Sequence, residues 1–175
     1  MRICMAPSSP PAMRTHHLLP IPDILLANDS RPVNRYLLDT KILSNAAKPR
    51  PSAPLIAWLE DQPDDALFIC SLTLAEIWSG TLELPAGKRR RALESWFAGS
   101  EGPQTLFAGR LLTFDEKAAF AWGRLMAEGE RIGRPRSPID MILAPIAEAN
   151  GCVVVTDNEK HFAGLTFINP MRPLR

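Results

Sequence analysis

The sequence is poor in cysteine, has almost no net charge and lacks a long apolar run. Its three cysteines, Cys4, Cys70 and Cys152, are odd in number and far apart, which excludes a disulfide scaffold and a zinc finger. We expect them to be small buried apolar side chains in a reducing compartment, the cytoplasm. No apolar run approaches the roughly 18 to 20 residues of a membrane-spanning helix, so no membrane partner is expected. Twenty Lys and Arg against nineteen Asp and Glu give a net charge of +1, which excludes a tail-type nucleic-acid binder but not a local basic patch.

Several common catalytic motifs are absent as well. The sequence has no glycine-rich phosphate loop of the GxxxxGK(S/T) type, no GxSxG and no HExxH. His161 is the only histidine beyond residue 34, and packing near Phe162 is its simpler explanation. A phosphatase or phosphotransferase with Asp39 as nucleophile stays an alternative, although Lys41 stands where such enzymes are expected to have a second Asp.

The N-terminal segment differs in composition from the rest. Residues 1–34 hold six of the seventeen prolines and only two acidic residues. This composition predicts a weakly ordered arm over residues 1–33, followed by one domain over residues 34–175. The prolines break the only candidate apolar segment, so no secretory signal is expected. An extension created by an upstream start codon is one hypothesis for this arm.

Beyond the arm, apolar runs alternate with amphipathic helical patterns. Strands are predicted at residues 35–39, 66–70, 110–114, 152–155 and 165–168. Helices are predicted at residues 51–59, 71–84, 87–97, 115–126 and 138–151. We expect Asp115 to cap the fourth helix and Pro145 to kink the last, whereas Ser71 or Thr73 should cap the second. Continuous apolar strands between helices indicate an α/β fold whose parallel sheet is covered on both faces.

Acidic and amide side chains follow several of these strands. Asp39 ends the first strand, Glu76 lies about one turn into the helix after the second, and Asp157 and Asn158 follow the strand at residues 152–155. Asp140 lies in the first turn of the helix that precedes that strand. Because ligands of parallel sheets bind beyond the carboxyl ends of the strands, we expect these side chains to converge on one edge.

Clustered carboxylates repel one another, so one of them takes a proton or a cation neutralises them. With oxygen ligands and no nearby thiol, the fitting cation is Mg²⁺ or Mn²⁺, which is suited to activating water and stabilising charge on a phosphoryl group. Taken singly, an Asp after a strand such as Asp39 is more often a helix cap than a ligand, and Glu76 is also explained as an acid of the first helical turn. The residues alone therefore leave the metal-site interpretation and the structural one open.

Five segments, in chain order, resemble the motifs of PIN-domain toxins of the VapC and FitB type. They are YLLDTKILS at 36–44, TLAEIWSG at 73–80, LFAGRLLTFD at 106–115, PID at 138–140, and VTDN at 155–158 with Phe162 and the INP at 168–170. The first is similar to the family's LLDTNVLS and the third to its LFAGRILPFD. The ordered set covers essentially the whole chain except the arm.

The resemblance implies a three-layer PIN fold with a central parallel sheet of about five short strands, and a magnesium-dependent endoribonuclease, with Mn²⁺ as the second possible ion. It also implies the toxin of a type II toxin–antitoxin pair, whose partners are RNA, a cognate antitoxin and, only through the antitoxin, DNA. The metal acids that it carries over are Asp39, Glu76 and Asp140, with Thr40 as a supporting hydroxyl. We also expect a homodimer, because the stretch at residues 71–107 has more large apolar side chains than one sheet face easily covers; core packing is the alternative.

Two positions depart from the family pattern. Lys41 replaces the usual Asn, and its cation is expected to supply part of the metal's charge or to contact RNA phosphate. The fourth acid of the family falls on Asn158, which we rank above Asp157, because an extended backbone points the Asp157 side chain elsewhere. Both departures also fit a second hypothesis, a catalytically silent PIN-like binding module.

Basic residues form two groups. The four at residues 88–91 are expected to be solvated. Arg131, Arg134 and Arg136 lie in a Gly- and Pro-containing segment just before Asp140, where they either hold an RNA backbone or form a solvated loop.

The arm hypothesis makes a direct prediction. Deleting residues 1–30 should leave the thermal unfolding midpoint and the activity unchanged, because Pro-rich polar sequence buries little apolar surface. Calorimetry and an activity assay on the two chain lengths check this. A large drop in the unfolding midpoint would show that the segment is part of the core.

Overall fold

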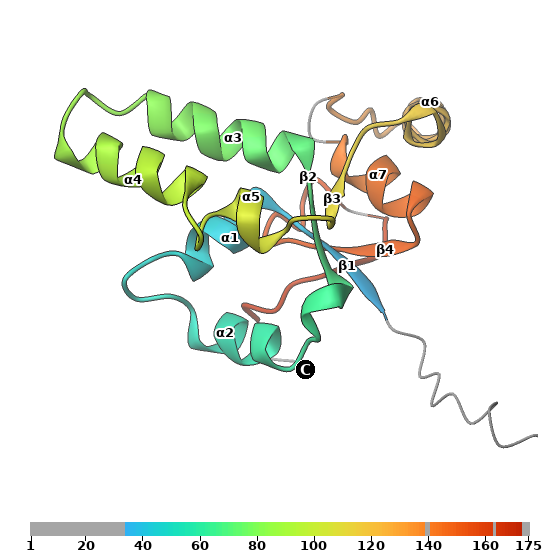
Figure 1. Ribbon diagram of the computed structural model, residues 1–175. Helices are drawn as coiled ribbons and strands as arrows, with labels where there is room; N and C mark the ends of the chain where they lie inside the picture. Colours follow the sequence, from blue (N-terminus) through green and yellow to red (C-terminus); the bar gives the residue numbers. More distant parts are fainter. Residues whose placement is uncertain (1–33, 139–140, 163, 173–175) are drawn as a thin grey trace, which may run out of the picture. The chain divides into compact units, whose positions relative to one another are not determined.

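The computed structural model describes residues 34–138, 141–162 and 164–172, and the predicted arm lies outside this range. In chain order the elements are β1 (Arg35–Leu38), α1 (Thr40–Ala46), α2 (Ala53–Glu60), the 3₁₀ helix η2 (Asp64–Ala66), β2 (Leu67–Cys70), α3 (Ser71–Leu82), α4 (Lys88–Ala98), α5 (Pro103–Leu106), β3 (Leu111–Leu112), α6 (Glu116–Arg131), α7 (Leu143–Ala149), β4 (Cys152–Val155) and β5 (Phe167–Ile168). Helices and strands alternate along most of the domain (Figure 1). The predicted α/β class is therefore confirmed.

All five strands form one parallel sheet in the order β3-β2-β1-β4-β5. The most apolar strands are central: β1 pairs with β2 on one side and with β4 on the other. Leu37 is opposite Val154, and Leu38 is opposite Val155. Since the strands are parallel, the carboxyl ends of β1, β2 and β4 lie at the same edge of the sheet.

Successive residues of β1 enter two different cores, as the alternation of a strand requires. Leu37 packs on one face with Leu125 of α6 and Ile146 of α7. Leu38 packs on the other face with Leu55 of α2 and with residues of α1. Helices thus cover both faces of the sheet, with α6 and α7 on one side and α1 and α2 on the other (Figure 1). This arrangement confirms the three-layer fold.

Helix ends correct some of the sequence expectations. Asp115 caps α6 as predicted, because its Oδ1 accepts the Ala118 N–H at 2.9 Å. Neither Ser71 nor Thr73 caps α3: the N-cap is Cys70, and Ser71 is already the first helical residue. The predicted kink at Pro145 was wrong, since α7 begins only at Leu143. Pro145 is then its third residue, where a missing N–H breaks no helical hydrogen bond.

Two helices were not predicted, and one strand is shorter than expected. The short helices α1 and α5 have seven and four residues, too few for a clear apolar period. The third strand covers only Leu111–Leu112 instead of residues 110–114. Arg110 instead binds carbonyls of Asp64, Leu67 and Leu106, which ties the turn before β3 to the start of β2.

The cysteines within the described residues differ in burial. Cys70 is fully buried in the core, as expected. Cys152, at the start of β4, is half-buried; burial raises the pKa of its thiol, and the Arg35 guanidinium partly lowers it again. Among the described residues, no helix is both long enough and apolar enough to cross a membrane.

Candidate active site

A pocket of about 570 Å³ lies at the carboxyl edge of the sheet. Its polar lining comes from three segments that are far apart in the sequence: the start of α1, the middle of α3 and the loop after β4. Five of the predicted site residues line it, namely Asp39, Thr40, Lys41, Glu76 and Asn158. Of the side chains that were expected to converge, the fold therefore brings Asp39, Glu76 and Asn158 together.

Asp39 reaches the pocket from the end of β1. Its backbone N–H donates to the Val155 carbonyl at 2.9 Å, which continues the β1–β4 ladder by one residue. It stands at the N-cap position of α1, but its side chain accepts no hydrogen bond from that helix. Its Oδ2 instead accepts the hydroxyl of Thr156 at 2.5 Å. The helix-cap explanation of Asp39 was therefore wrong.

Glu76 projects from α3 on the opposite wall. It is the sixth residue of the helix, and the first turn of α3 contains no acid, so the first-turn explanation of Glu76 was also wrong. The hydroxyl of Thr40, the first residue of α1, donates to Glu76 Oε2. Asp39 and Glu76 thus each accept a hydrogen bond from a threonine on a different element.

Thr156 is the site residue that the sequence analysis missed. It is fully buried. Its Oγ1 donates to Asp39 and also accepts the backbone N–H of Asn158 at 3.0 Å. One hydroxyl therefore links the Asp39 carboxylate to the loop after β4. The signal in the sequence was its place between an apolar strand and an Asp–Asn pair, but only the acids and the amide were considered.

Asn158 and Asp157 leave the end of β4 in different directions. Asn158 lines the pocket, and its Nδ2 lies 2.9 Å from His161 Nδ1. Asp157 is not a lining residue; its Oδ1 lies 4.0 Å from Lys41 Nζ, with both side chains exposed. Such an exposed pair contributes at most about 1 kcal/mol. The geometry agrees with ranking Asn158 above Asp157. The assignment of either residue to the site stays a prediction.

The donor set of the pocket suits a hard cation. Asp39, Glu76, Glu83 and Asn158 offer carboxylate and amide oxygens, and no thiol of the described chain lines the pocket. Asp140, the third predicted metal acid, lies outside the described residues. Within those residues, no group of three His, Cys, Asp or Glu side chains is placed to hold a metal ion. The described oxygen donors are of the kind that a hard cation such as Mg²⁺ or Mn²⁺ prefers, but they do not by themselves form such a group.

The basic residues separate in the structure. Arg134 and Arg136 line a second pocket, of about 410 Å³, whereas Arg131 is the exposed last residue of α6 and does not line it. His161 lines both pockets. The group at residues 88–91 opens α4 and is mostly exposed, as expected, with Arg90 paired to Glu94 at 2.8 Å.

This fold and site define a PIN domain: the family model of that name matches residues 36–167, and the chain belongs to the PIN-domain family. Within the family, it is 34% identical to VapC ribonuclease Y4jK of Sinorhizobium fredii, over 78% of this chain and 98% of the relative. Plasmid stability protein StbB of Pseudomonas syringae pv. tomato is also 34% identical, over 77% of this chain and 96% of StbB. Toxin FitB of Neisseria gonorrhoeae is 29% identical, over 77% of this chain and 96% of FitB.

Solved structures give the same relationship. A structure of FitAB bound to an IR36 DNA fragment aligns with a TM-score of 0.73 at 27% identity, covering 80% of this chain and 98% of that one. FitAcB from Neisseria gonorrhoeae aligns with a TM-score of 0.71 at 28% identity, covering 77% and 97%. The resemblance seen in the sequence motifs is therefore confirmed.

The double hydrogen bond of Thr156 makes a stability prediction. Thr156→Val keeps the shape but leaves the Asn158 N–H and the Asp39 carboxylate without their partner, which should lower the free energy of unfolding by about 1–3 kcal/mol. Thr156→Ser keeps the hydroxyl and should cost only about 1 kcal/mol for one missing methyl group. Urea unfolding of the three proteins measures the difference. Equal losses in both variants would contradict a hydrogen-bonding role.

Proposed function

We propose that this chain is the toxin of a type II toxin–antitoxin pair and cleaves RNA as a metal-dependent endoribonuclease. The observation that carries the proposal is the meeting of Asp39 and Glu76, each held by a threonine hydroxyl, in one pocket with Asn158. The names of its relatives support it: besides VapC ribonuclease Y4jK, a tRNA(fMet)-specific endonuclease VapC of Shigella flexneri is 28% identical over 89% of its own length.

Asp39, Glu76 and Asp140 would hold Mg²⁺, with Mn²⁺ as the second ion, and Asn158 would complete the site through its amide oxygen. When bound, such an ion polarises a phosphate oxygen and lowers the pKa of a coordinated water. The protein's own contribution is orientation, because the hydroxyls of Thr156 and Thr40 restrict the rotation of the Asp39 and Glu76 carboxylates.

Lys41 acts on the substrate side in this proposal. It lines the same pocket as the two acids, and the Asp157 carboxylate 4.0 Å away only partly offsets its charge. An exposed ammonium in this place attracts the phosphate of an RNA strand towards two carboxylates that would otherwise repel it.

Substituting the acids tests the metal site. Asp39→Asn and Asp140→Asn keep size and remove charge, so each should leave the fold intact and lower Mg²⁺-dependent RNA cleavage about a hundredfold or more, equivalent to roughly 3 kcal/mol of transition-state stabilisation. The matched control is Asp115→Asn, which removes the same charge at the cap of α6 and should cost about 1 kcal/mol of stability or less.

Cleavage rates against Mg²⁺ concentration, with circular dichroism for folding, give the answer. Full activity in Asp140→Asn, or a folded but inactive Asp115→Asn, would place the site on other acids. A wild-type chain without Mg²⁺-dependent cleavage would favour the catalytically silent binding module. A trapped aspartyl-phosphate at Asp39 would instead favour a phosphatase or phosphotransferase.

The same function implies partners in the cytoplasm: a cognate antitoxin, a second copy of this chain and, through the antitoxin alone, DNA.

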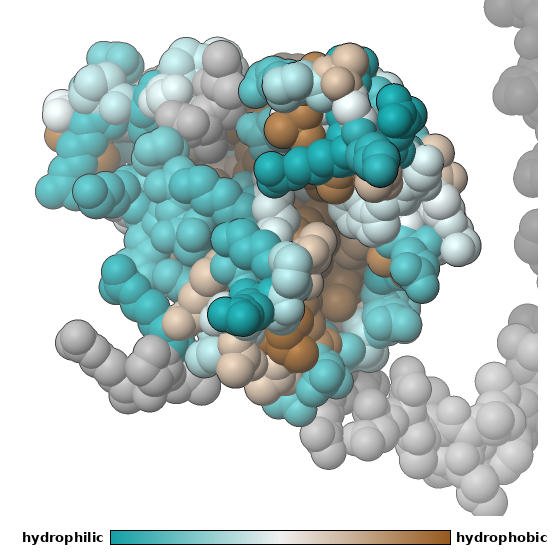
Figure 2. All heavy atoms as spheres, turned by 90° about the vertical axis from the view of Figure 1, so that its left-hand side faces the viewer, coloured by the Kyte–Doolittle hydropathy of each residue, from teal (hydrophilic) through white to brown (hydrophobic). Residues whose placement is uncertain are grey.

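The helical hairpin of α3 and α4 offers a surface for one of the two protein partners. Phe97 is buried in the hairpin, with its ring centroid 5.0 Å from that of Trp78, but Trp78 and Leu82 remain 38% and 39% exposed. Figure 2, viewed from the left-hand side of Figure 1, shows hydrophobic patches bordered by hydrophilic side chains. Solved complexes such as DNA-bound VapBC from Salmonella typhimurium, with a TM-score of 0.60 at 27% identity, support a partner-bound state.

We predict that Trp78→Gln with Leu82→Gln weakens the assembly formed with the cognate antitoxin, whose small gene the family resemblance places directly upstream. Removing two half-exposed apolar groups from an interface should cost about tenfold or more in affinity. Phe120→Gln on α6, which is 74% exposed, is the matched control. Light scattering of the chain alone and with that protein measures the assembly. A chain that stays monomeric in both samples would contradict the proposed surface.

A further inference from the structure

The second pocket is basic and shares a wall with the candidate active site. Arg134, Arg136 and Lys160 line it, and His161 belongs to its lining and to that of the first pocket. The lining also includes Glu128, but this acid lies 3.7 Å from the Arg124 guanidinium, so its charge is partly offset. The two neighbouring pockets therefore have opposite character, one built around carboxylates and one around cations.

The loop that supplies the two arginines is held on α6. Gly133 makes the turn with φ +67°, a conformation that favours glycine. The backbone N–H of Arg134 then donates to the Gly129 carbonyl at 2.9 Å, and the indole N–H of Trp122 donates to the Pro138 carbonyl at 3.2 Å. Both ends of the loop are thus anchored, although every residue from 131 to 138 except Arg136 is exposed.

Gly129 lets the loop approach α6 this closely. A Cβ at this position would lie 2.9 Å from the Arg134 carbonyl oxygen and 3.2 Å from Arg136 Cγ. By contrast, a Cβ at Gly123 of the same helix would meet nothing within 4 Å. The absence of a side chain at Gly129 therefore allows the cationic loop to pack closely against α6.

Arg136 contributes a buried guanidinium nitrogen to this pocket. Arg136 Nη1 is buried and has no hydrogen-bond partner among the described residues. The ion pairs in that part of the chain do not include Arg134, Arg136 or Lys160. Leaving a charged donor buried and unpaired costs more than a neutral one, so an anion in this pocket would be stabilised by supplying the acceptor.

We propose that this second pocket binds a backbone phosphate of the RNA strand, next to the phosphate that enters the first pocket. The inference rests on the proposed ribonuclease function and adds where the strand lies, which is across His161 towards Arg134 and Lys160. Cations fix the strand through its phosphates, and such interactions position a nucleic acid without reading its sequence.

Salt-dependent RNA binding tests this proposal. Fluorescence anisotropy of the full chain with a labelled single-stranded RNA, in EDTA to prevent cleavage, gives the affinity at several salt concentrations. Arg134→Gln with Lys160→Gln should weaken binding about tenfold. The slope of log affinity against log salt should become shallower by about 0.7 for each phosphate that the variant no longer neutralises.

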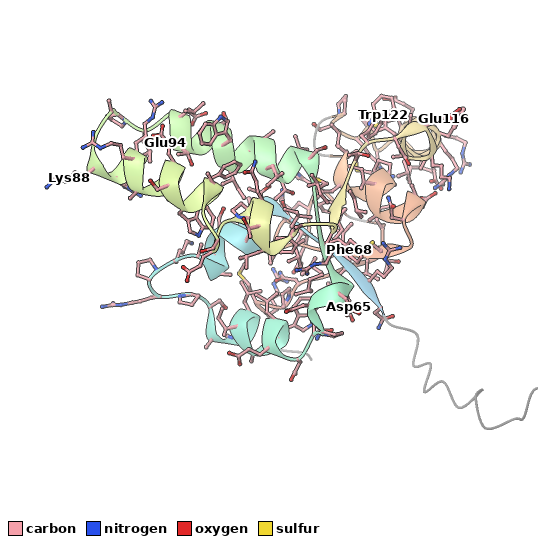
Figure 3. The ribbon with its side chains drawn as sticks, in the orientation of Figure 1. Asp65, Phe68, Lys88, Glu94, Glu116 and Trp122 are labelled. Atoms are coloured by element: carbon pink, nitrogen blue, oxygen red, sulfur yellow. The ribbon has the colours of Figure 1, made fainter. Side chains whose placement is uncertain are left out.

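The matched control removes two positive charges elsewhere. Arg89→Gln with Arg91→Gln changes the net charge equally at the start of α4, whose Lys88 lies far from Trp122 of α6 (Figure 3). This double variant should keep the wild-type slope of log affinity against log salt. An RNA with a single neutral methylphosphonate linkage, moved along the strand, should bind the wild type more weakly when the linkage falls at the phosphate of the second pocket, and the Arg134/Lys160 variant should lose the effect at that position alone.

Gly129→Ala gives a second, independent variant that leaves every charge in place. Because its Cβ displaces the loop, it should weaken RNA binding about as much as the double variant, whereas Gly123→Ala should not. Circular dichroism of all variants checks their folding.

The outcomes separate the two proposals. If the Arg134/Lys160 variant keeps the wild-type slope and the wild-type response to the neutral linkage, while the wild type cleaves RNA with Mg²⁺, the phosphate pocket is overturned and the proposed function stands. If the wild type does not cleave RNA with Mg²⁺, the proposed function fails, whatever the binding data show. A shallower slope in the Arg134/Lys160 variant, with the wild-type slope kept in the Arg89/Arg91 variant, supports the pocket.

Discussion

The parallel register between β1 and β4 is the constraint on which the site depends. Because Leu38 pairs with Val155, the next residues of the two strands, Asp39 and Thr156, become neighbours at the edge of the sheet. The Asp39 N–H donates to the Val155 carbonyl, and the Thr156 N–H donates to the Ile168 carbonyl on β5. The sheet therefore fixes the backbone at both residues, independently of the bond between their side chains. A shift of one residue would point Asp39 to the other face of the sheet. The hydrogen bond between the two side chains is thus a consequence of strand pairing, which the burial of Leu37 and Leu38 stabilises.

Charge is divided between two neighbouring pockets. Like-charged carboxylates close together destabilise a fold unless hydrogen bonds or a cation compensate. The threonine hydroxyls that bond Asp39 and Glu76 supply part of that compensation from the protein itself. The cations lie mainly in the adjoining pocket, where Arg134 and Lys160 are separated from the acids by His161. Had these cations paired with the acids directly, both groups would be neutralised and neither would attract a ligand. Their separation leaves carboxylates in one pocket and cations in the neighbouring pocket.

Local patterns predicted the fold well, because the strands are short, continuous apolar runs and the longer helices have a clear apolar face. The same patterns missed α1, because seven residues are too few to show an apolar periodicity. They also misplaced the start of α7, and the position of that start decides whether Pro145 breaks a helical hydrogen bond. In the site, Asp39, Glu76 and Asn158 were predictable because acids and amides after strands point to the sheet edge. Thr156 and Lys160 were not, since their partners are far apart in the sequence and depend on the strand register and on how a loop packs against α6.

The two departures from the family motif act in the same direction. Lys41 in place of Asn adds one positive charge to the first pocket, and Asn158 in place of an acid removes one negative charge, so the pocket is more positive by two charges than the motif it resembles. Both residues line the pocket, and the Asp157 carboxylate, which is turned outward, offsets Lys41 only across 4.0 Å at an exposed position. A pocket with fewer net negative charges attracts a divalent cation less strongly and a phosphodiester more strongly. Binding of a divalent cation in such a pocket would therefore depend strongly on the orientation of its acids. Of the three described carboxylates that line it, Asp39 and Glu76 are hydrogen-bonded to threonines, and Glu83 accepts the hydroxyl of Ser79.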